Sequence, residues 1–206
     1  MRPTTPIEDQ KRVLIIDALN MFLRSYTIIP SMDPQGMPNG GTVGFLKSLQ
    51  ALCREMRPHE VIICWDGHGG SEKRRQLNKE YKQGRRPVRF NRRMIELPED
   101  KVKKNRTDQQ LRLHEYLNNM PVIQLMVDFV EADDVIAYVT QHKKYKDWQK
   151  IIISSDKDFF QLVGDDNVMI WRPIQKVFVD RITLINKFGI HPNNYALARA
   201  IDGDKS

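Results

Sequence analysis

The sequence has little of what marks several special classes of protein. Only two of its 206 residues are cysteines, Cys53 and Cys64, so it needs no disulfide framework, and both are expected to be reduced thiols. It has no signal peptide and no apolar run of about 18 residues, which excludes a membrane-spanning helix and predicts a cytoplasmic protein. Its five histidines are scattered and lack the spacing of zinc ligands.

What the chain does have is the composition of one globular domain, with an uneven charge. Hydrophobic residues make up 40% and charged residues 29%, enough to bury a core. The segment from His68 to Arg106 holds 14 of the 33 Lys and Arg residues but 5 of the 26 Asp and Glu residues, a local charge of +9. The remainder, with 19 basic and 21 acidic residues, carries −2. The excess positive charge therefore lies in one insertion.

This insertion, at about residues 68–106, has few large apolar residues and contains Pro87 and Pro98 as breakers. It is either a solvated, partly disordered loop or a flexible basic arm that closes on a polyanion. Arginines dominate where the run is densest, with Tyr81 and Phe90 among them, which suits phosphate and base contacts. A membrane surface is the weaker partner, because no amphipathic stripe accompanies the charge. The candidate nucleic-acid contacts are Arg74, Arg75, Tyr81, Arg86, Arg89, Arg92 and Arg93.

Outside the insertion, strand and helix patterns alternate. Four short apolar runs read as strands buried on both faces: 13–16, 61–65, 122–127 and 151–153. Helical patterns follow them at 42–56, 108–120, 133–141 and 157–163. A small hairpin at 168–171 and 177–179 and a helix at 192–201 complete the chain. This alternation predicts the α/β class, with a central, mainly parallel sheet flanked by helices.

Acidic residues follow all four predicted strands. Because the carboxyl ends of parallel strands share one edge, where ligands of open α/β sheets bind, the pattern predicts an acidic cleft. The residues are Asp17, Asp66, Glu131, Asp133, Asp134, Asp156 and Asp158.

Any one of these carboxylates could simply be the N-cap of the helix after its strand. Capping needs one carboxylate per helix, however, so Glu131, Asp134 and Asp158 are surplus. Seven carboxylates in a partly desolvated cleft would repel one another and raise several pKa values. We therefore expect cations among them.

The donor set indicates which cations these are. The ligands are all oxygen, which disfavours zinc and suits Mg²⁺ or Mn²⁺. Seven carboxylates exceed what one octahedral ion needs, so we expect two ions, about 4 Å apart as in known two-metal sites. A two-metal acidic site beside a basic arm predicts phosphodiester chemistry.

Six segments resemble, in order, the motifs of the 5′-nuclease family. They are LIIDALNMFLRSY, ICWDG, EYKQGR, VEADDVIA, SSDKDFFQL and the terminal GDKS. The family comprises flap endonucleases, the 5′-3′ exonuclease domain of bacterial DNA polymerase I and phage 5′-exonucleases. The resemblance covers nearly the whole chain, and the phage enzymes of the ribonuclease H type are the most similar. It implies a PIN-like catalytic domain over residues 1–206, with the insertion as a flexible helical arch.

The resemblance also assigns roles to residues. It implies a first metal cluster of Asp17, Asp66, Glu131, Asp133 and Asp134, and a second of Asp156, Asp158 and Asp204, with Asp134 placed to serve both. Lys82 and Arg85 match arch residues that hold the scissile phosphate, and Arg24 matches a basic residue near it. Gly44 and Phe45 resemble the helix start that meets the end of the duplex.

The function implied is that of a structure-specific 5′-3′ exonuclease and 5′-flap endonuclease that uses two Mg²⁺ or Mn²⁺ ions. Its substrates would be DNA with a 5′ flap, nick or free 5′ end, and RNA-DNA hybrids, cut during primer removal in replication and repair. We expect a monomer that works with replication proteins, in the host cytoplasm if a phage encodes it, and no membrane partner.

The chain departs from the family pattern at its end. In the family, GDKS is followed by a further Asp and by a helix-hairpin-helix region that grips duplex DNA, and both are absent here. We expect a truncated form. Alternatives are a PIN-type endoribonuclease, a non-catalytic nucleic-acid-binding module, and a phosphohydrolase of small phosphoesters. The last would need a DxD motif after the first strand, which DALN lacks.

Overall fold

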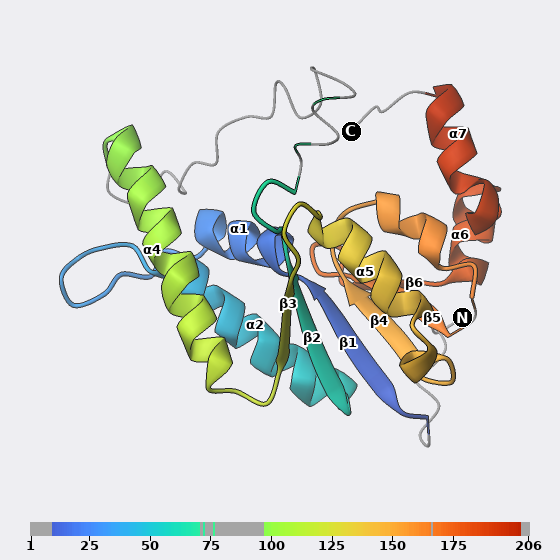
Figure 1. The fold of residues 1–206 in the computed structure, drawn as a ribbon, viewed down its shortest axis with the longest axis horizontal. Coiled ribbons are helices and arrows are strands. Elements are labelled where there is room, and N and C mark those ends of the chain that lie inside the picture. Colours follow the sequence, from blue (N-terminus) through green and yellow to red (C-terminus); the bar gives the residue numbers. More distant parts are fainter. Residues whose placement is uncertain (1–9, 71, 73–75, 77–96, 166, 203–206) are drawn as a thin grey trace.

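The computed structural model of the chain describes residues 10–70, 72, 76, 97–165 and 167–202 (Figure 1). Its central layer is a six-stranded sheet with the order β3-β2-β1-β4-β5-β6. The strands are β1 (Arg12–Asp17), β2 (Glu60–Trp65), β3 (Ile123–Met126), β4 (Gln149–Ile153), β5 (Val168–Arg172) and β6 (Val177–Val179). All neighbouring strands are parallel except β6, which runs antiparallel to β5. The predicted mainly parallel α/β sheet is confirmed.

Helices cover both faces of this sheet (Figure 1). The α-helices are α1 (Ala18–Ile28), α2 (Gly40–Met56), α4 (Glu99–Asn118), α5 (Ala132–Gln141), α6 (Arg181–Phe188) and α7 (Tyr195–Asp202). The short 3₁₀ helices are η1 (Lys143–Tyr145), η2 (Asp158–Leu162) and η3 (Pro192–Asn194). Within the described ranges, none of the helices combines the length and apolar composition that a membrane crossing requires.

The central strand β1 separates two hydrophobic cores. Its side chains alternate: Val13 and Ile15 join the core that includes α5, η2 and α6, whereas Leu14 and Ile16 join the core that includes α1, α2 and α4. All four are fully buried. From β1 the chain builds outward to β2 and β3 on one side, and later to β4 and β5 on the other. The boundary between β1 and β4 is therefore the topological switch point, where ligands bind in such sheets.

Helix α1 follows β1 without a loop and was not predicted from the sequence, and neither was α6. Helix α1 packs closely on α2, because Gly44 of α2 has no side chain. A Cβ at Gly44 would lie 2.7 Å from Cβ of Ser25 on α1. This close approach fixes α1, and with it the end of β1.

Two predictions about this fold are wrong in detail. The third strand is not buried on both faces: β3 is an edge strand, and Ile123 and Met126 are 41% and 55% exposed. The helix predicted at 108–120 begins earlier, at Glu99, so that α4 also includes residues 99–106 of the basic insertion. There the amide of Asn105 is buried and donates to the carbonyl of Pro38 at 2.9 Å. Most of residues 71–96 lie outside the described residues.

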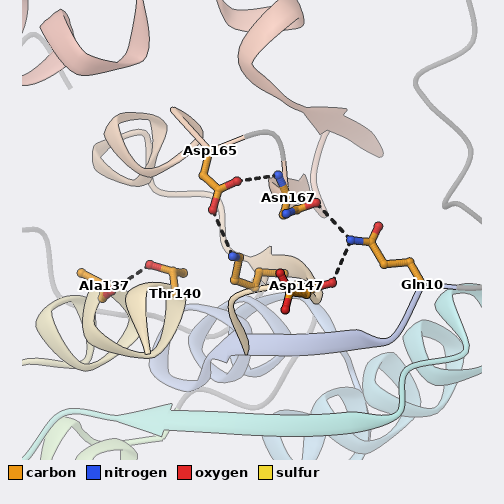
Figure 2. A network of polar contacts seen from close by, with 7 residues as sticks. Gln10, Ala137, Thr140, Asp147, Asp165 and Asn167 are labelled. Atoms are coloured by element: carbon orange, nitrogen blue, oxygen red, sulfur yellow. Dashed lines mark hydrogen bonds and ion pairs between the residues drawn. The ribbon is translucent and has the colours of Figure 1, made fainter. Parts of the chain in front are cut away.

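A polar network joins the amino ends of three strands (Figure 2). Gln10 Nε2 donates to the carbonyl of Asp147 and to Asn167 Oδ1, both at 3.0 Å. Lys150 on β4 is 1% exposed, and its Nζ lies 3.1 Å from Asp165 Oδ2. Because the Asp165 carboxylate balances this buried ammonium, the network stabilises the edge of the sheet opposite to the acidic residues.

Candidate metal centre

Asp17 ends the central strand and is only 7% exposed. Its Oδ1 accepts the backbone N–H of Asn20 at 3.1 Å, which makes it the N-cap of α1. Its Oδ2 accepts the hydroxyl of Ser154 at 2.9 Å. The capping role considered from the sequence is thus correct for Asp17. It does not exclude a second role, because the same carboxylate also interacts with the acidic residues on neighbouring strands.

Ser154 connects the ends of β1 and β4. It is fully buried, and while its hydroxyl donates to Asp17, its Oγ accepts the N–H of Asp156 at 3.0 Å. A second link runs from the N–H of Ser155 to Asn20 Oδ1 at 3.3 Å. These hydrogen bonds connect five residues at the ends of β1 and β4, which we call the β1–β4 clamp: Asp17, Asn20, Ser154, Ser155 and Asp156. The clamp fixes the positions of Asp17 and Asp156 relative to one another.

Asp66, directly after β2, is tied to the start of α5. Its Oδ1 accepts the backbone N–H of Ala132 at 2.8 Å. The next residue, Gly67, donates to the carbonyl of Val130 at 3.0 Å, and a Cβ there would lie 1.7 Å from the carbonyl oxygen of Val127. Only glycine allows this approach. The loop after β2 thus holds the segment that carries Glu131 and Asp133.

The electrostatics show which carboxylates share one region. Burial, followed by repulsion from Asp66 and Asp156, raises the pKa of Asp17 to about 6, although its hydrogen bonds oppose the shift. Burial raises the pKa of Asp133 to about 7, with further repulsion from Asp17, Asp156, Asp66 and Glu131. Glu131 is 2% exposed. The structure therefore gathers five carboxylates from the ends of four strands at the predicted edge.

The other predicted residues are placed differently. Asp134 and Asp158 are exposed, and Asp158 Oδ1 lies 3.8 Å from Arg199 Nη2. Arg24 is partly buried on α1, and this burial lowers its pKa. The remaining predicted site residues lie outside the described residues: Arg74, Arg75, Tyr81, Lys82, Arg85, Arg86, Arg89, Arg92, Arg93 and Asp204.

The prediction for Phe45 is wrong. Its side chain is fully buried and stacks on Trp65, with ring centroids 6.2 Å apart, so it does not face a duplex. The reason is that Phe45 lies on the apolar face of α2, which packs on the sheet. Gly44 is likewise buried, against α1.

The chemistry of the site suits hard divalent cations. As placed, no three His, Cys, Asp or Glu side chains in the described part of the chain form a group that could hold a metal ion. The donors are nonetheless all carboxylate oxygens, and the pKa values of Asp17 and Asp133 are raised first by burial and then by repulsion from neighbouring carboxylates. A cation would relieve this repulsion, so the residues fit Mg²⁺ or Mn²⁺.

Asn20 and Ser154 were missed by reasoning from the sequence. Both lie within segments that carry predicted ligands, DALN and SSDKDF. The general rule that metal-binding carboxylates are themselves held by hydrogen bonds could have singled them out.

The sheet order and the acidic switch point define a doubly wound α/β domain with a candidate divalent-metal centre. The sequence pattern of the family described as 5′-3′ exonuclease, N-terminal resolvase-like domain, matches residues 12–189. The chain therefore belongs to the 5′-3′ exonuclease family.

Two curated relatives illustrate this membership. A 5′-3′ exonuclease of Aquifex aeolicus is 29% identical over 196 residues, which cover 95% of this chain and 62% of the relative. The flap endonuclease Xni of Shewanella baltica is 31% identical over 194 residues, covering 94% of this chain and 66% of the relative. The chain thus spans slightly less than two thirds of the length of these relatives.

Solved structures from bacteriophage T5 share the fold. A T5 protein co-crystallised with metal ions aligns over 94% of this chain and 67% of its own, with a TM-score of 0.74 and 17% identity. The T5 flap endonuclease in a complex with DNA and metal ions aligns with a TM-score of 0.70 and 15% identity, over the same shares of the two chains. These alignments confirm the predicted PIN-like class.

Proposed function

We propose that this chain is the catalytic domain of a divalent-metal-dependent 5′-3′ exonuclease and 5′-flap endonuclease. The observation that carries the proposal is the gathering of five carboxylates at the switch point of the sheet. Membership of the 5′-3′ exonuclease family supports the type of reaction. The substrates proposed are DNA with a 5′ flap, nick or free 5′ end and RNA-DNA hybrids, in primer removal by a monomer that cooperates with replication proteins.

Two Mg²⁺ or Mn²⁺ ions are proposed as cofactors. One ion would be held by Asp17, Asp66, Glu131, Asp133 and Asp134. The other ion would be held by Asp156, Asp158 and Asp204. When bound, such ions polarise the phosphodiester and activate water for in-line attack.

The chain itself would supply orientation and positive charge. The β1–β4 clamp holds Asp17 and Asp156 in place before a substrate arrives, which limits the reorganisation needed during the reaction. Lys82 and Arg85 would offset the charge that develops on the nonbridging phosphate oxygens, with Arg24 close to the same phosphate. The products would carry a 5′ phosphate and a free 3′ hydroxyl.

The proposal is tested by end-labelled substrates: a 5′-flap DNA, an RNA-DNA hybrid and a plain single strand, each with Mg²⁺ and with EDTA. We expect metal-dependent cleavage near the base of the flap, and none by Asp66→Asn. The test includes a version extended to the length of the relatives. If neither version cuts in a metal-dependent way, the proposal fails, whereas internal cleavage of single-stranded RNA alone would favour the PIN-type endoribonuclease.

Lys82→Ala is expected to lower the single-turnover cleavage rate by on the order of 100-fold while changing duplex affinity by about threefold or less. The reason is that a cation on the reacting phosphate acts mainly in the transition state. Rapid-quench kinetics and fluorescence anisotropy measure the two quantities, with Lys101→Ala as the control. Equal losses of rate and affinity would contradict a catalytic role.

Ser154→Ala is expected to weaken Mn²⁺ binding by about tenfold, because Asp17 loses a donor and the N–H of Asp156 loses its acceptor. Isothermal titration calorimetry measures this affinity without substrate. The loss of two buried hydrogen bonds should also lower the free energy of unfolding by about 2 kcal/mol.

The matched control for this substitution is Ser25→Ala. Ser25 is also a buried serine, but its hydroxyl donates to a helix carbonyl, that of Met21, at 3.0 Å. It should leave Mn²⁺ affinity unchanged. An unaltered affinity in Ser154→Ala would show that the clamp has no part in holding the metal.

A further inference from the structure

A large groove lies between the β5–β6 hairpin and α6, separate from the acidic residues themselves. Its volume is about 970 Å³, and four aromatic rings line it. Trp171 and Phe178 pair across the two strands with centroids 4.7 Å apart, on the face of the sheet that packs on α1 and α2. Phe160 and Phe188, 5.8 Å apart, lie on the opposite face with α6, so the groove passes around the β6 edge of the sheet. Of these, Phe188 is 42% exposed. The groove thus offers flat apolar surfaces in contact with solvent.

The groove reaches the same edge of the sheet as the acidic site. Arg172, which lines it, is the last residue of β5, and its Nη2 donates to the carbonyl of Ser155 at 3.2 Å. Ser155 belongs to the β1–β4 clamp and directly precedes Asp156. The guanidinium of Arg172 also stacks over Phe160, 5.6 Å from the ring centroid. Arg172 therefore links the groove to the carboxylates.

Two polar atoms at this junction have no hydrogen-bond partner within the described residues. They are Nε of Arg172 and Oγ of Ser155, and both are buried. Buried polar groups are normally paired, so such exceptions call for an explanation. Both groups can donate a hydrogen bond, and a phosphate oxygen is an acceptor that suits arginine in particular.

Further cations lie along the groove. Lys176 occupies the turn of the hairpin, and Lys187 on α6 places its Nζ 5.7 Å from the ring of Phe188. The acidic residues of the lining are Glu55 and Asp180, and Asp180 caps α6 by accepting the N–H of Thr183 at 2.7 Å. Aromatic rings alternating with cations are the pattern that binds single-stranded nucleic acid, in which bases stack and phosphates meet positive charge.

We propose that this groove binds a single-stranded segment of nucleic acid that passes around the β6 edge of the sheet. One phosphate would lie at Arg172, with bases stacked against Phe188 on one face and against the Trp171–Phe178 pair on the other. The inference rests on the proposed function, since the strand would be part of the substrate at the acidic site. A purely apolar partner would offer no negative charge to Arg172, Lys176 and Lys187.

The test measures binding of fluorescein-labelled oligothymidylate to the full chain in EDTA, by fluorescence anisotropy. Phe188→Ala should weaken binding about tenfold, and Lys187→Ala about threefold. The matched controls are Tyr116→Ala, which removes an aromatic ring that is 51% exposed on α4, and Lys146→Ala. Both controls should bind like the unchanged protein.

Tryptophan fluorescence provides a second readout that does not depend on the folding of Phe188→Ala. Unlabelled oligothymidylate should quench the emission, because a base stacks beside Trp171, and Trp171→Phe should abolish the quenching. Persistent quenching in Trp171→Phe would assign it to Trp65 or Trp148 and overturn the proposal.

The outcomes separate this inference from the proposed function. Loss of binding in the groove variants, together with no cleavage of flap DNA by either the chain or its extended version, would support the groove and refute the nuclease. Flap cleavage together with unchanged oligonucleotide affinity in Phe188→Ala and Lys187→Ala would refute the groove alone. A dimer that forms without nucleic acid and is lost in Phe188→Ala, with no effect on oligonucleotide binding, would assign the groove to a second copy and also overturn the proposal.

Discussion

Asp133→Asn is expected to abolish metal-dependent cleavage and, at the same time, to make the metal-free protein more stable above neutral pH. Burial raises the pKa of Asp133 to about 7, and repulsion from four neighbouring carboxylates adds to this shift. Removing its charge should cost on the order of 100-fold or more in rate, because a ligand is lost. It should raise the free energy of unfolding by about 2 kcal/mol at pH 8, after allowance for solvent screening.

The pH dependence of this stabilisation has a definite sign. The pKa of Asp133 is about 7 in the folded protein and near 3.8 in the unfolded chain. Between these values the unfolded chain has lost its proton while the folded protein still holds it, so rising pH favours unfolding. The increase in the free energy of unfolding caused by Asp133→Asn should therefore vanish near pH 4 and reach its full size at about pH 8.

Thermal unfolding in EDTA at several pH values measures the effect. A gain of about 5 °C in melting temperature is expected at pH 8 for a domain of this size. Asp108→Asn, which removes an exposed carboxylate on α4, should change little. A lower melting temperature of Asp133→Asn at pH 8 would mean that the Asp133 carboxylate stabilises the metal-free fold, contrary to this account.

Divalent metal is expected to stabilise the protein strongly at pH 8 and hardly at all at pH 4.5. Mg²⁺ binds ionised carboxylates, whereas the raised pKa values of Asp17 and Asp133, about 6 and about 7, keep both protonated at pH 4.5. At a metal concentration about 100 times the dissociation constant, binding should contribute about 2.7 kcal/mol. The melting temperature at pH 8 should then rise by about 7 °C.

Titration with MgCl₂ and MnCl₂ at the two pH values, followed by excess EDTA, checks this expectation. NaCl at matched ionic strength controls for general screening of charge. The double variant Asp17→Asn, Asp133→Asn should show no specific shift. An equal rise at both pH values, or in the double variant, would place the stabilising metal elsewhere.

The topology explains why the acidic site could be predicted from the sequence. Continuous apolar runs identify strands buried on both faces, and parallel strands bring the residues that follow them to one edge. The correct strand order was therefore enough to predict that five carboxylates lie together: Asp17, Asp66, Glu131, Asp133 and Asp156. The N-cap role of Asp17 is compatible with its proposed role as a metal ligand.

The remaining details depend on tertiary contacts that periodicity does not encode. The clamp through Ser154 forms because β1 and β4 are neighbours, so its contacts depend on the order of the strands. Phe45 was misassigned because the motif alone does not show that its side chain packs in the core on the sheet. The exposure of β3 follows from its place at the edge of the sheet, which its own composition does not reveal.

The clamp has a consequence for the protein while it is being synthesised. Asp17 and Ser154 are 137 residues apart in sequence, and the strands that carry them must pair before the contact can form. A nascent chain on the ribosome would already display its cationic segment while lacking one side of the carboxylate cluster. Such non-local contacts form late in folding. If the proposed activity needs both sides of this cluster, it would arise only after β4 has been synthesised and has paired with β1.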